Sequence, residues 1–174
     1  MEYIDKGAEI SPDGIYRYRL WRKWKRDNRI AFFGKLVIVM LNPSTADGLE
    51  DDPTIRKCVG FADRNGYDEI MVLNLFAFRA TDPRALTRFD GSIIGTENYD
   101  RFDSEIPGRD VLCAWGGEVA KKRLAFGAAV GVERVLAAEP RRTFCLGKTA
   151  AGIPRHPLML AYTQPLVPIF ARLG

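Results

Sequence analysis

An unbroken apolar run at residues 36–41 (LVIVML) stops at a polar turn that begins with Asn42 and Pro43. The run is too short for a buried helix and is rich in branched side chains, so it predicts a strand buried on both faces. Pro43 withdraws one backbone donor and biases Asn42 away from helical dihedrals. We therefore expect Asn42 to be held at a bend, at the carboxyl end of a central strand.

The rest of the hydrophobic pattern alternates between strands and helices. A helix is expected at 53–65, capped by Asp51-Asp52 and stopped by Gly66. Strands are expected at 69–73, 110–115 and 143–146, helices at 96–106 and 119–138, and a loop at 81–95. The second of these helices is expected to be interrupted near Gly127 or Gly131. This order predicts an α/β fold, a three-layer α/β/α sandwich around a mostly parallel four-stranded core sheet.

Residues 15–24 (IYRYRLWRKW) alternate apolar and basic side chains, which is the pattern of a half-buried strand. We expect this strand at the edge of the sheet, after an N-terminal extension of about residues 1–14. Its outer face would form a basic ridge made of Arg17, Arg19, Arg22, Lys23, Lys25 and Arg26. Two interpretations fit: an edge strand kept soluble by charge, or a phosphate-binding face.

Composition indicates one ordinary domain spanning residues 1–174, with 47% hydrophobic and 28% charged residues. No apolar run approaches the roughly 18 residues of a membrane span. The N-terminus lacks a signal-peptide pattern, so a cytoplasmic protein is expected. Cys58, Cys113 and Cys145 are far apart among apolar neighbours, which indicates reduced core thiols, and neither a metal nor a cofactor is expected. The net charge of +4 permits contact with nucleic acid without requiring it.

Polar side chains follow the predicted strands at the edge where open α/β sheets bind ligands. Asn42 and Asn74 each come directly after a strand, and His156, the single histidine, lies in the loop after the last core strand. Phe76 and Arg79 lie just beyond Asn74, where they can stack on a flat ring, although Phe76 also suits the core.

A GKT triplet at 147–149 resembles the end of a phosphate-binding P-loop. That loop needs a glycine five positions before Gly147, and Arg142 stands there instead. We therefore reject a nucleoside triphosphatase of this type.

The blocks MLNPSTAD, DPTIRKC, NLFAFRATDP, AWG and LGKT…HPL resemble the family named domain of unknown function 1643 (DUF1643), from about Tyr16 to the end of the chain. The same blocks are similar, more faintly, to the uracil-DNA glycosylase superfamily. Asn42-Pro43 is similar to the NP motif whose asparagine positions the attacking water. Asn74 looks like the base-reading asparagine, and His156-Pro157 resembles the late HP motif that stabilises the departing base. The resemblance implies the glycosylase fold and a nucleobase ligand in DNA or in a nucleoside.

Cleavage of an N-glycosidic bond passes through an oxocarbenium-like sugar and an anionic base. It needs a water holder, an amide that reads the base edge, a donor for the anion and an aromatic face, which Asn42, Asn74, His156 and Phe76 can supply in turn. The catalytic candidates are Asn42 and His156. The substrate-binding candidates are Pro43, Ser44, Asp47, Asn74, Phe76 and Arg79.

The acidic residues near the turn argue against a phosphate backbone at the pocket, because Asp47, Asp51 and Asp52 would repel it. Metal binding and polarisation of a water are the alternative roles for these acids, and we expect Asp51 and Asp52 to cap the helix. Three hypotheses remain open: a glycosylase-type enzyme, a module that binds a nucleobase without cutting, and an enzyme of another reaction on the same fold.

Overall fold

The computed structural model of the 174-residue chain describes residues 1–25, 34–44, 48–82, 85–86, 91–120 and 122–170. Its strands are β1 (Tyr3–Ile10), β2 (Arg17–Trp24), β3 (Lys35–Met40), β4 (Glu69–Asn74), β5 (Asp110–Cys113), β6 (Thr143–Cys145) and β7 (Val167–Pro168). Its helices are α1 (Pro53–Arg64), α2 (Asn98–Glu105) and α3 (Lys122–Ala138), with short 3-10 turns η2 (Gly117–Ala120) and η3 (Pro140–Arg142). The predicted α/β fold is confirmed. None of the described helices combines the length and the apolar character needed to cross a membrane.

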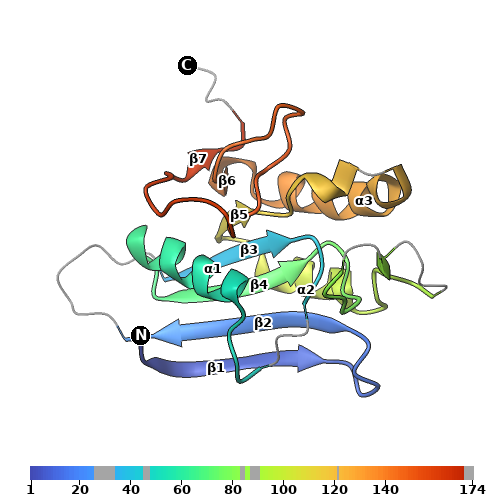
Figure 1. The fold of residues 1–174 in the computed structure, drawn as a ribbon, viewed down its shortest axis with the longest axis horizontal. Helices are drawn as coiled ribbons and strands as arrows, with labels where there is room; N and C mark the ends of the chain where they lie inside the picture. The colour runs from blue at the N-terminus through green and yellow to red at the C-terminus, as the bar shows by residue number, and fades with distance from the viewer. Residues whose placement is uncertain (26–33, 45–47, 83–84, 87–90, 121, 171–174) are drawn as a thin grey trace.

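The seven described strands form one mixed sheet in the order β1-β2-β4-β3-β5-β6-β7 (Figure 1). β3 pairs in parallel with β4 and with β5, and β5 pairs in parallel with β6. The pairs β1-β2, β2-β4 and β6-β7 are antiparallel. The apolar run at 36–41 thus lies at the centre of the sheet, as predicted. The sheet is larger and more mixed than expected because antiparallel strands extend it on both sides.

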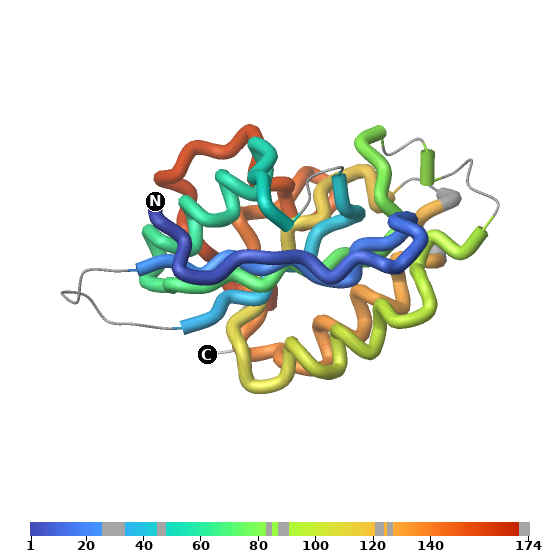
Figure 2. The backbone as a smooth tube through the Cα atoms, turned by 90° about the horizontal axis from the view of Figure 1, so that it is seen from below, coloured from blue at the N-terminus to red at the C-terminus, as the bar shows by residue number. Residues whose placement is uncertain are grey.

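Alternate side chains of β3 contribute to two separate cores. Leu36, Ile38 and Met40 pack in the cluster that contains the buried residues of α1. Val37 and Val39 pack in the cluster that contains buried residues of α2 and α3. Figure 2 shows α1 on one side of the sheet and α2 and α3 on the other. The two-sided burial explains why every position of this strand from Leu36 to Met40 is apolar.

Helix α1 begins and ends close to the predicted residues. Asp52 is the N-cap and accepts a hydrogen bond from the Ile55 N–H at 2.7 Å, and Pro53 occupies the first helical position. The helix ends at the Asn65 cap, and Gly66 follows with a φ of +93°. Its start is therefore fixed by a side chain that also lies at the candidate site described below.

Helix α3 is continuous, so the predicted interruption near Gly127 or Gly131 is wrong. Both glycines instead allow the helix to approach the sheet. A Cβ atom at Gly127 would lie 3.2 Å from Phe76, and one at Gly131 would lie 3.1 Å from Leu75. The missing side chains are explained by close packing rather than by a break in the helix.

The N-terminal part of the chain differs most from the prediction. Residues 3–10, expected in an extension, form β1, and β1 covers β2, so β2 is not an edge strand. The predicted basic ridge is only partly a solvent face: Lys25 is exposed, Arg17 and Arg22 are buried, and Arg26 lies outside the described residues. The Arg22 Nε donates to Asp51 at 2.7 Å, and its Nη1 donates to the Gly7 carbonyl of β1 at 3.2 Å. Asp51 therefore neutralises Arg22 and does not cap the helix.

Ion pairs link β1, β2, β3 and α2 on the face opposite α1. Glu105 accepts a hydrogen bond from Arg19 at 2.7 Å and lies 3.4 Å from the Lys35 ammonium. Glu9 in turn bridges Arg19 and Arg101. Because Glu105 is 9% exposed and serves two cations, its charge is expected to stabilise the fold more than a surface ion pair does.

Glu105→Gln should lower the free energy of unfolding by about 2 kcal/mol, since it leaves two partly buried cations without their shared carboxylate. Asp103→Asn is the matched control on the same helix, because Asp103 pairs with Arg134 at the surface. Urea denaturation of both variants measures the difference. Equal, small effects would show that the network contributes no more than an exposed pair.

Candidate functional site

A pocket of about 300 Å³ lies at the carboxyl ends of β3 and β4, beside the first turn of α1 and the segment that follows β6. It is lined by Arg17, Met40, Asn42, Ser44, Asp52, Thr54, Ile55, Asn74, Ala80, Thr81, His156 and Leu158. Four residues singled out in the sequence are thus brought together: Asn42, Ser44, Asn74 and His156. Segments more than 100 residues apart in the chain meet here.

Asn74 is the last residue of β4, and its side chain is buried at the pocket wall. The residue is 1% exposed, yet neither its Nδ2 nor its Oδ1 has a hydrogen-bond partner among the described residues. Its backbone carbonyl accepts a hydrogen bond from the Asn98 Nδ2 at 2.9 Å. A buried amide without hydrogen-bond partners lowers the free energy of unfolding by about 1–3 kcal/mol. Such unsatisfied groups are unusual away from a binding site.

Asn42 is oriented by the backbone around it. Its Nδ2 donates to the Ala80 carbonyl at 2.7 Å and to the Pro43 carbonyl at 3.0 Å. The Ala80 N–H in turn donates to the Pro43 carbonyl at 2.9 Å, which joins the turn after β3 to the segment after β4. With both amide hydrogens committed, Oδ1 remains as an acceptor, and no described residue donates to it.

Asp52 connects the start of α1 to the turn after β3. One carboxylate oxygen accepts from the Ile55 N–H, and the other accepts from the Ser44 hydroxyl. Asp52 is therefore the helix cap that the sequence predicted, and its hydrogen bond fixes Ser44 at the pocket wall. Both oxygens are engaged by the protein itself, which limits the capacity of this carboxylate to accept a proton from a water molecule.

His156 is positioned by the ends of β5 and β6. The neighbouring Arg155 N–H donates to the Gly147 carbonyl at 3.0 Å, and the Gly116 N–H donates to the Pro154 carbonyl at 3.1 Å. Gly116 has a φ of +75°, and a Cβ there would lie 3.1 Å from the His156 Cβ. The glycine after β5 is therefore required both by the backbone and by the histidine that packs on it.

The hydrogen bonds of His156 define the tautomer of its ring. Nδ1 accepts a hydrogen bond from the Leu158 N–H at 3.3 Å, so the neutral ring carries its proton on Nε2. Burial lowers the pKa of His156 from the usual 6.5, and the charge of Asp52 opposes part of this shift. Near neutral pH the ring is therefore an uncharged hydrogen-bond donor through Nε2–H.

The His156 pKa should be directly measurable, because the chain contains a single histidine. Proton NMR of the imidazole C–H signals should give a midpoint below 6.5. A group with a depressed folded-state pKa binds fewer protons than in the unfolded chain, so stability should fall as pH drops below about 6.5 and level off below the folded pKa. His156→Asn should remove this slope. A midpoint at or above 6.5 would contradict the buried, neutral state.

Arg17 reaches the pocket through an irregularity in β2 that the sequence did not reveal. Glu9 of β1 pairs with Arg19 and Ile10 pairs with Arg17, so Tyr18 is an extra residue, as in a β-bulge. Arg17 is 2% exposed and lines the pocket. Burial, together with the nearby charge of Arg79, lowers its pKa to about 10, while Asp52 favours the charged form. The residue remains a cation at neutral pH.

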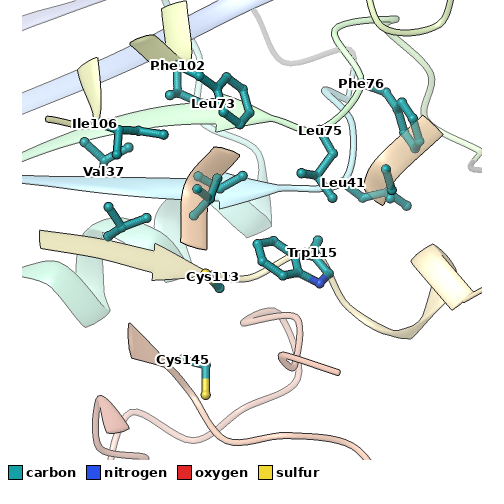
Figure 3. Close-up of a cluster of buried hydrophobic side chains, with 14 of the residues drawn as sticks. Val37, Leu41, Leu73, Leu75, Phe76, Phe102, Ile106, Cys113, Trp115 and Cys145 are labelled. Atoms are coloured by element: carbon teal, nitrogen blue, oxygen red, sulfur yellow. The ribbon is translucent and has the colours of Figure 1, made fainter. Parts of the chain in front are cut away.

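The remaining candidates lie beside the pocket, in the core or outside the described residues. Phe76 is fully buried in the cluster between the sheet and α3 (Figure 3), so its assignment to a ring-stacking role is wrong. Arg79 does not line the pocket, and its Nη1 donates to the Gly14 carbonyl at 3.1 Å. Pro43 is buried below Asn42 and holds it through its carbonyl. Asp47 lies outside the described residues.

The pocket thus combines four kinds of polar group. They are the unsatisfied amide of Asn74, the Oδ1 acceptor of Asn42, the neutral Nε2–H donor of His156 and the guanidinium of Arg17. Its apolar wall consists of Met40, Ile55 and Leu158. Within the described ranges, no three His, Cys, Asp or Glu side chains are grouped as a metal site would need. The three cysteines are buried free thiols, as predicted.

The family model described as protein of unknown function (DUF1643) matches residues 17–158, and the chain belongs to this family. The matched span includes all twelve residues that line the pocket, from Arg17 to Leu158. Strands β1 and β7 lie outside it. No curated protein and no solved structure matches the chain.

Proposed function

We propose that this member of the DUF1643 family recognises a nucleobase in the pocket and hydrolyses its N-glycosidic bond. The observation that carries the proposal is the buried Asn74 amide, whose donor and acceptor both lack partners among the described residues. A nucleobase edge presents an acceptor and a donor side by side, so it can satisfy both atoms of one amide at once. The cost of leaving the amide unsatisfied would then be recovered when the ligand binds.

The pocket walls suit a flat ring. Met40, Ile55 and Leu158 provide apolar surface, and the volume of about 300 Å³ lies at the lower end of the range for pockets that bind small molecules. Because Phe76 belongs to the core, the ring faces would contact these aliphatic side chains rather than an aromatic one. The site also lies at the carboxyl ends of the parallel strands, where open α/β sheets in general bind ligands.

The reaction gives a role to each of the two catalytic candidates, Asn42 and His156. A water oxygen attacks the anomeric carbon, the carbon–nitrogen bond breaks, and its electron pair leaves with the base. One proton of the water ends on the base nitrogen, and the hydroxyl stays on the sugar. Asn42 would orient the water through Oδ1, and His156 would donate from Nε2–H to the developing anion.

Binding without cleavage is the second candidate function. The observation that favours it is the engagement of both Asp52 oxygens by Ser44 and Ile55, which leaves this carboxylate poorly placed to take a proton from water. In that case the same pocket would read a base and release it unchanged.

The test is release of free base. The protein is incubated with the common nucleosides and with single-stranded and mismatched duplex oligonucleotides that contain uracil, and the products are separated by chromatography. Released base that disappears in Asn42→Ala supports hydrolysis, since loss of one positioning contact costs on the order of a hundredfold or more in rate. Binding without release supports the second function. Absence of both binding and release would reject the nucleobase proposal.

A further inference from the structure

A second pocket, of about 360 Å³, is formed by α3, the segment after β6 and the residues that follow β7. These elements lie together at the end of the sheet opposite β1 (Figure 1), and the pocket shares no lining residue with the candidate site. Its apolar wall includes Trp115, Val119, Val132, Leu136, Ile153 and Ile169, which belong to or pack against the core on this face of the sheet. A cavity of this size and character suits the apolar part of a small molecule.

Trp115 contributes a hydrogen-bond donor to this wall. The residue lies just beyond the end of β5 (Figure 3) and is 4% exposed, yet its indole N–H donates to no described residue. A buried tryptophan N–H usually has a hydrogen-bond partner. A ligand that brings an acceptor into the cavity would supply one.

Lys148 contributes a second donor and the only charged side chain among the described residues of this wall. It is exposed at the rim, where its ammonium donates to the Ile169 carbonyl at 2.8 Å. Its backbone is held as well, because Lys148 bridges Pro154 across a short turn in which the Thr149 N–H donates to the Ile153 carbonyl at 2.8 Å. No described carboxylate pairs with the ammonium, so two of its three N–H groups remain available.

We infer that this pocket binds a small monocarboxylate with an apolar body, and that Lys148 and Trp115 donate to its carboxylate. Both polar side chains of the described wall can only donate, so the head group of the ligand has to be an acceptor. One ammonium neutralises one negative charge, whereas a dianion would bring a second charge to an otherwise apolar wall. An aliphatic chain and an aromatic ring offer the same apolar surface. The inference does not depend on the nucleobase proposal, because the two pockets are separate.

Isothermal titration calorimetry with the full chain tests the inference without any substitution. The ligands are hexanoate, octanoate, phenylpropionate, octanol and octylammonium. Octanoate should bind at least about tenfold more tightly than octanol, because its charge strengthens the hydrogen bonds from Lys148 and Trp115. Octylammonium should bind most weakly, since Lys148 repels it. Each added methylene should tighten the binding of the straight-chain acids about threefold to fourfold.

Substitutions then assign the head group to its partners. Lys148→Met removes the charge and keeps the length of the side chain, so the affinity for octanoate should fall about tenfold while octanol binds as before. Lys6→Met is the matched control, because Lys6 also donates to a backbone carbonyl, that of Leu49 at 2.9 Å, but lies on β1. Trp115→Phe removes the N–H and keeps an aromatic ring, and it should weaken octanoate about fivefold.

Equal binding of octanoate and octanol by the wild-type chain overturns the carboxylate site, and so does the failure of every carboxylate to bind at millimolar concentration. Tighter binding of octanoate than of phenylpropionate supports an aliphatic ligand, and the reverse order supports an aromatic one. Self-association of the chain that Val132→Asp abolishes, without binding of any carboxylate, assigns the pocket to a second copy and overturns the inference. The wild-type ligand series decides the matter even where Lys148→Met or Trp115→Phe does not fold.

Discussion

Asn74→Leu will lose the ligand of the pocket and yet unfold at a higher temperature than the wild-type chain. The substitution preserves the approximate shape of the side chain and removes two buried polar atoms that have no partner among the described residues. Removal of such atoms should raise the free energy of unfolding by about 1 kcal/mol. For a chain of this size that corresponds to a rise of about 2–4 °C in Tm, which differential scanning calorimetry resolves.

Asn98→Leu is the matched control, since Asn98 is also fully buried and, although its Oδ1 lacks a partner among the described residues too, its Nδ2 is used in the fold. Its Nδ2 donates to the Asn74 carbonyl at 2.9 Å, so the substitution should lower the free energy of unfolding by about 1–2 kcal/mol. Opposite signs for the two buried asparagines would identify Asn74 as a residue kept for binding at a cost in stability. A loss of stability in Asn74→Leu would instead show that its amide supports the fold.

The central part of the fold can be predicted from the sequence, because its strands and helix ends depend on residues that are close together in the chain. An apolar run bounded by Asn42 and Pro43 predicts a doubly buried strand, and β3 has helices on both sides. The pair Asp52 and Pro53 predicts the start of α1 within a residue. The asparagines after β3 and β4 come to one pocket because the carboxyl ends of parallel neighbours share one sheet edge.

The N-terminal strands could not be predicted in the same way, because their environment depends on pairing between distant residues. Asp5, Lys6 and Glu9 interrupt the apolar pattern of residues 3–10, and these residues form a strand by pairing with the edge of β2. That pairing buries Arg22, whose position in an alternating pattern resembles a solvent-facing one. The bulge that directs Arg17 to the pocket is a shift in the pairing register between β1 and β2. The sequence of one strand alone therefore does not reveal it.

Phe76 shows a similar limit at the site. Its place two residues after Asn74 suits a stacking role. Whether its side chain faces the pocket or the core depends on the backbone conformation after β4. The close approach of α3 at Gly127 sets Phe76 in the core instead. Gly127 is the sequence signal for this contact, although a glycine inside a helical pattern also predicts a break.

Asn42→Asp should destabilise the chain more than Asn42→Ala does, although the aspartate has nearly the same shape. From the sequence alone, a polar turn open to solvent predicts a change of no more than about 1 kcal/mol. The structure alters this expectation, because Nδ2 donates to both the Ala80 and the Pro43 carbonyls. A carboxylate would lose both hydrogen bonds and repel both carbonyl oxygens, at a cost of about 2–3 kcal/mol. Alanine loses the bonds without the repulsion and should cost about 1 kcal/mol.

The pH dependence of Asn42→Asp supplies a further test. Two facing carbonyls should raise the folded-state pKa of the new carboxyl, so the variant should regain stability relative to wild type as the pH falls and the group becomes a donor. Urea denaturation across an acidic pH series measures this, with Asn42→Ala as a variant that has no such dependence. If Asn42→Asp is as stable as wild type at neutral pH, Nδ2 does not hold the turn, and the geometry that leaves Oδ1 facing the ligand is wrong. If Asn42→Asp is unstable at neutral pH and Asn42→Ala binds the ligand but releases no base, the amide both holds the turn and positions the water.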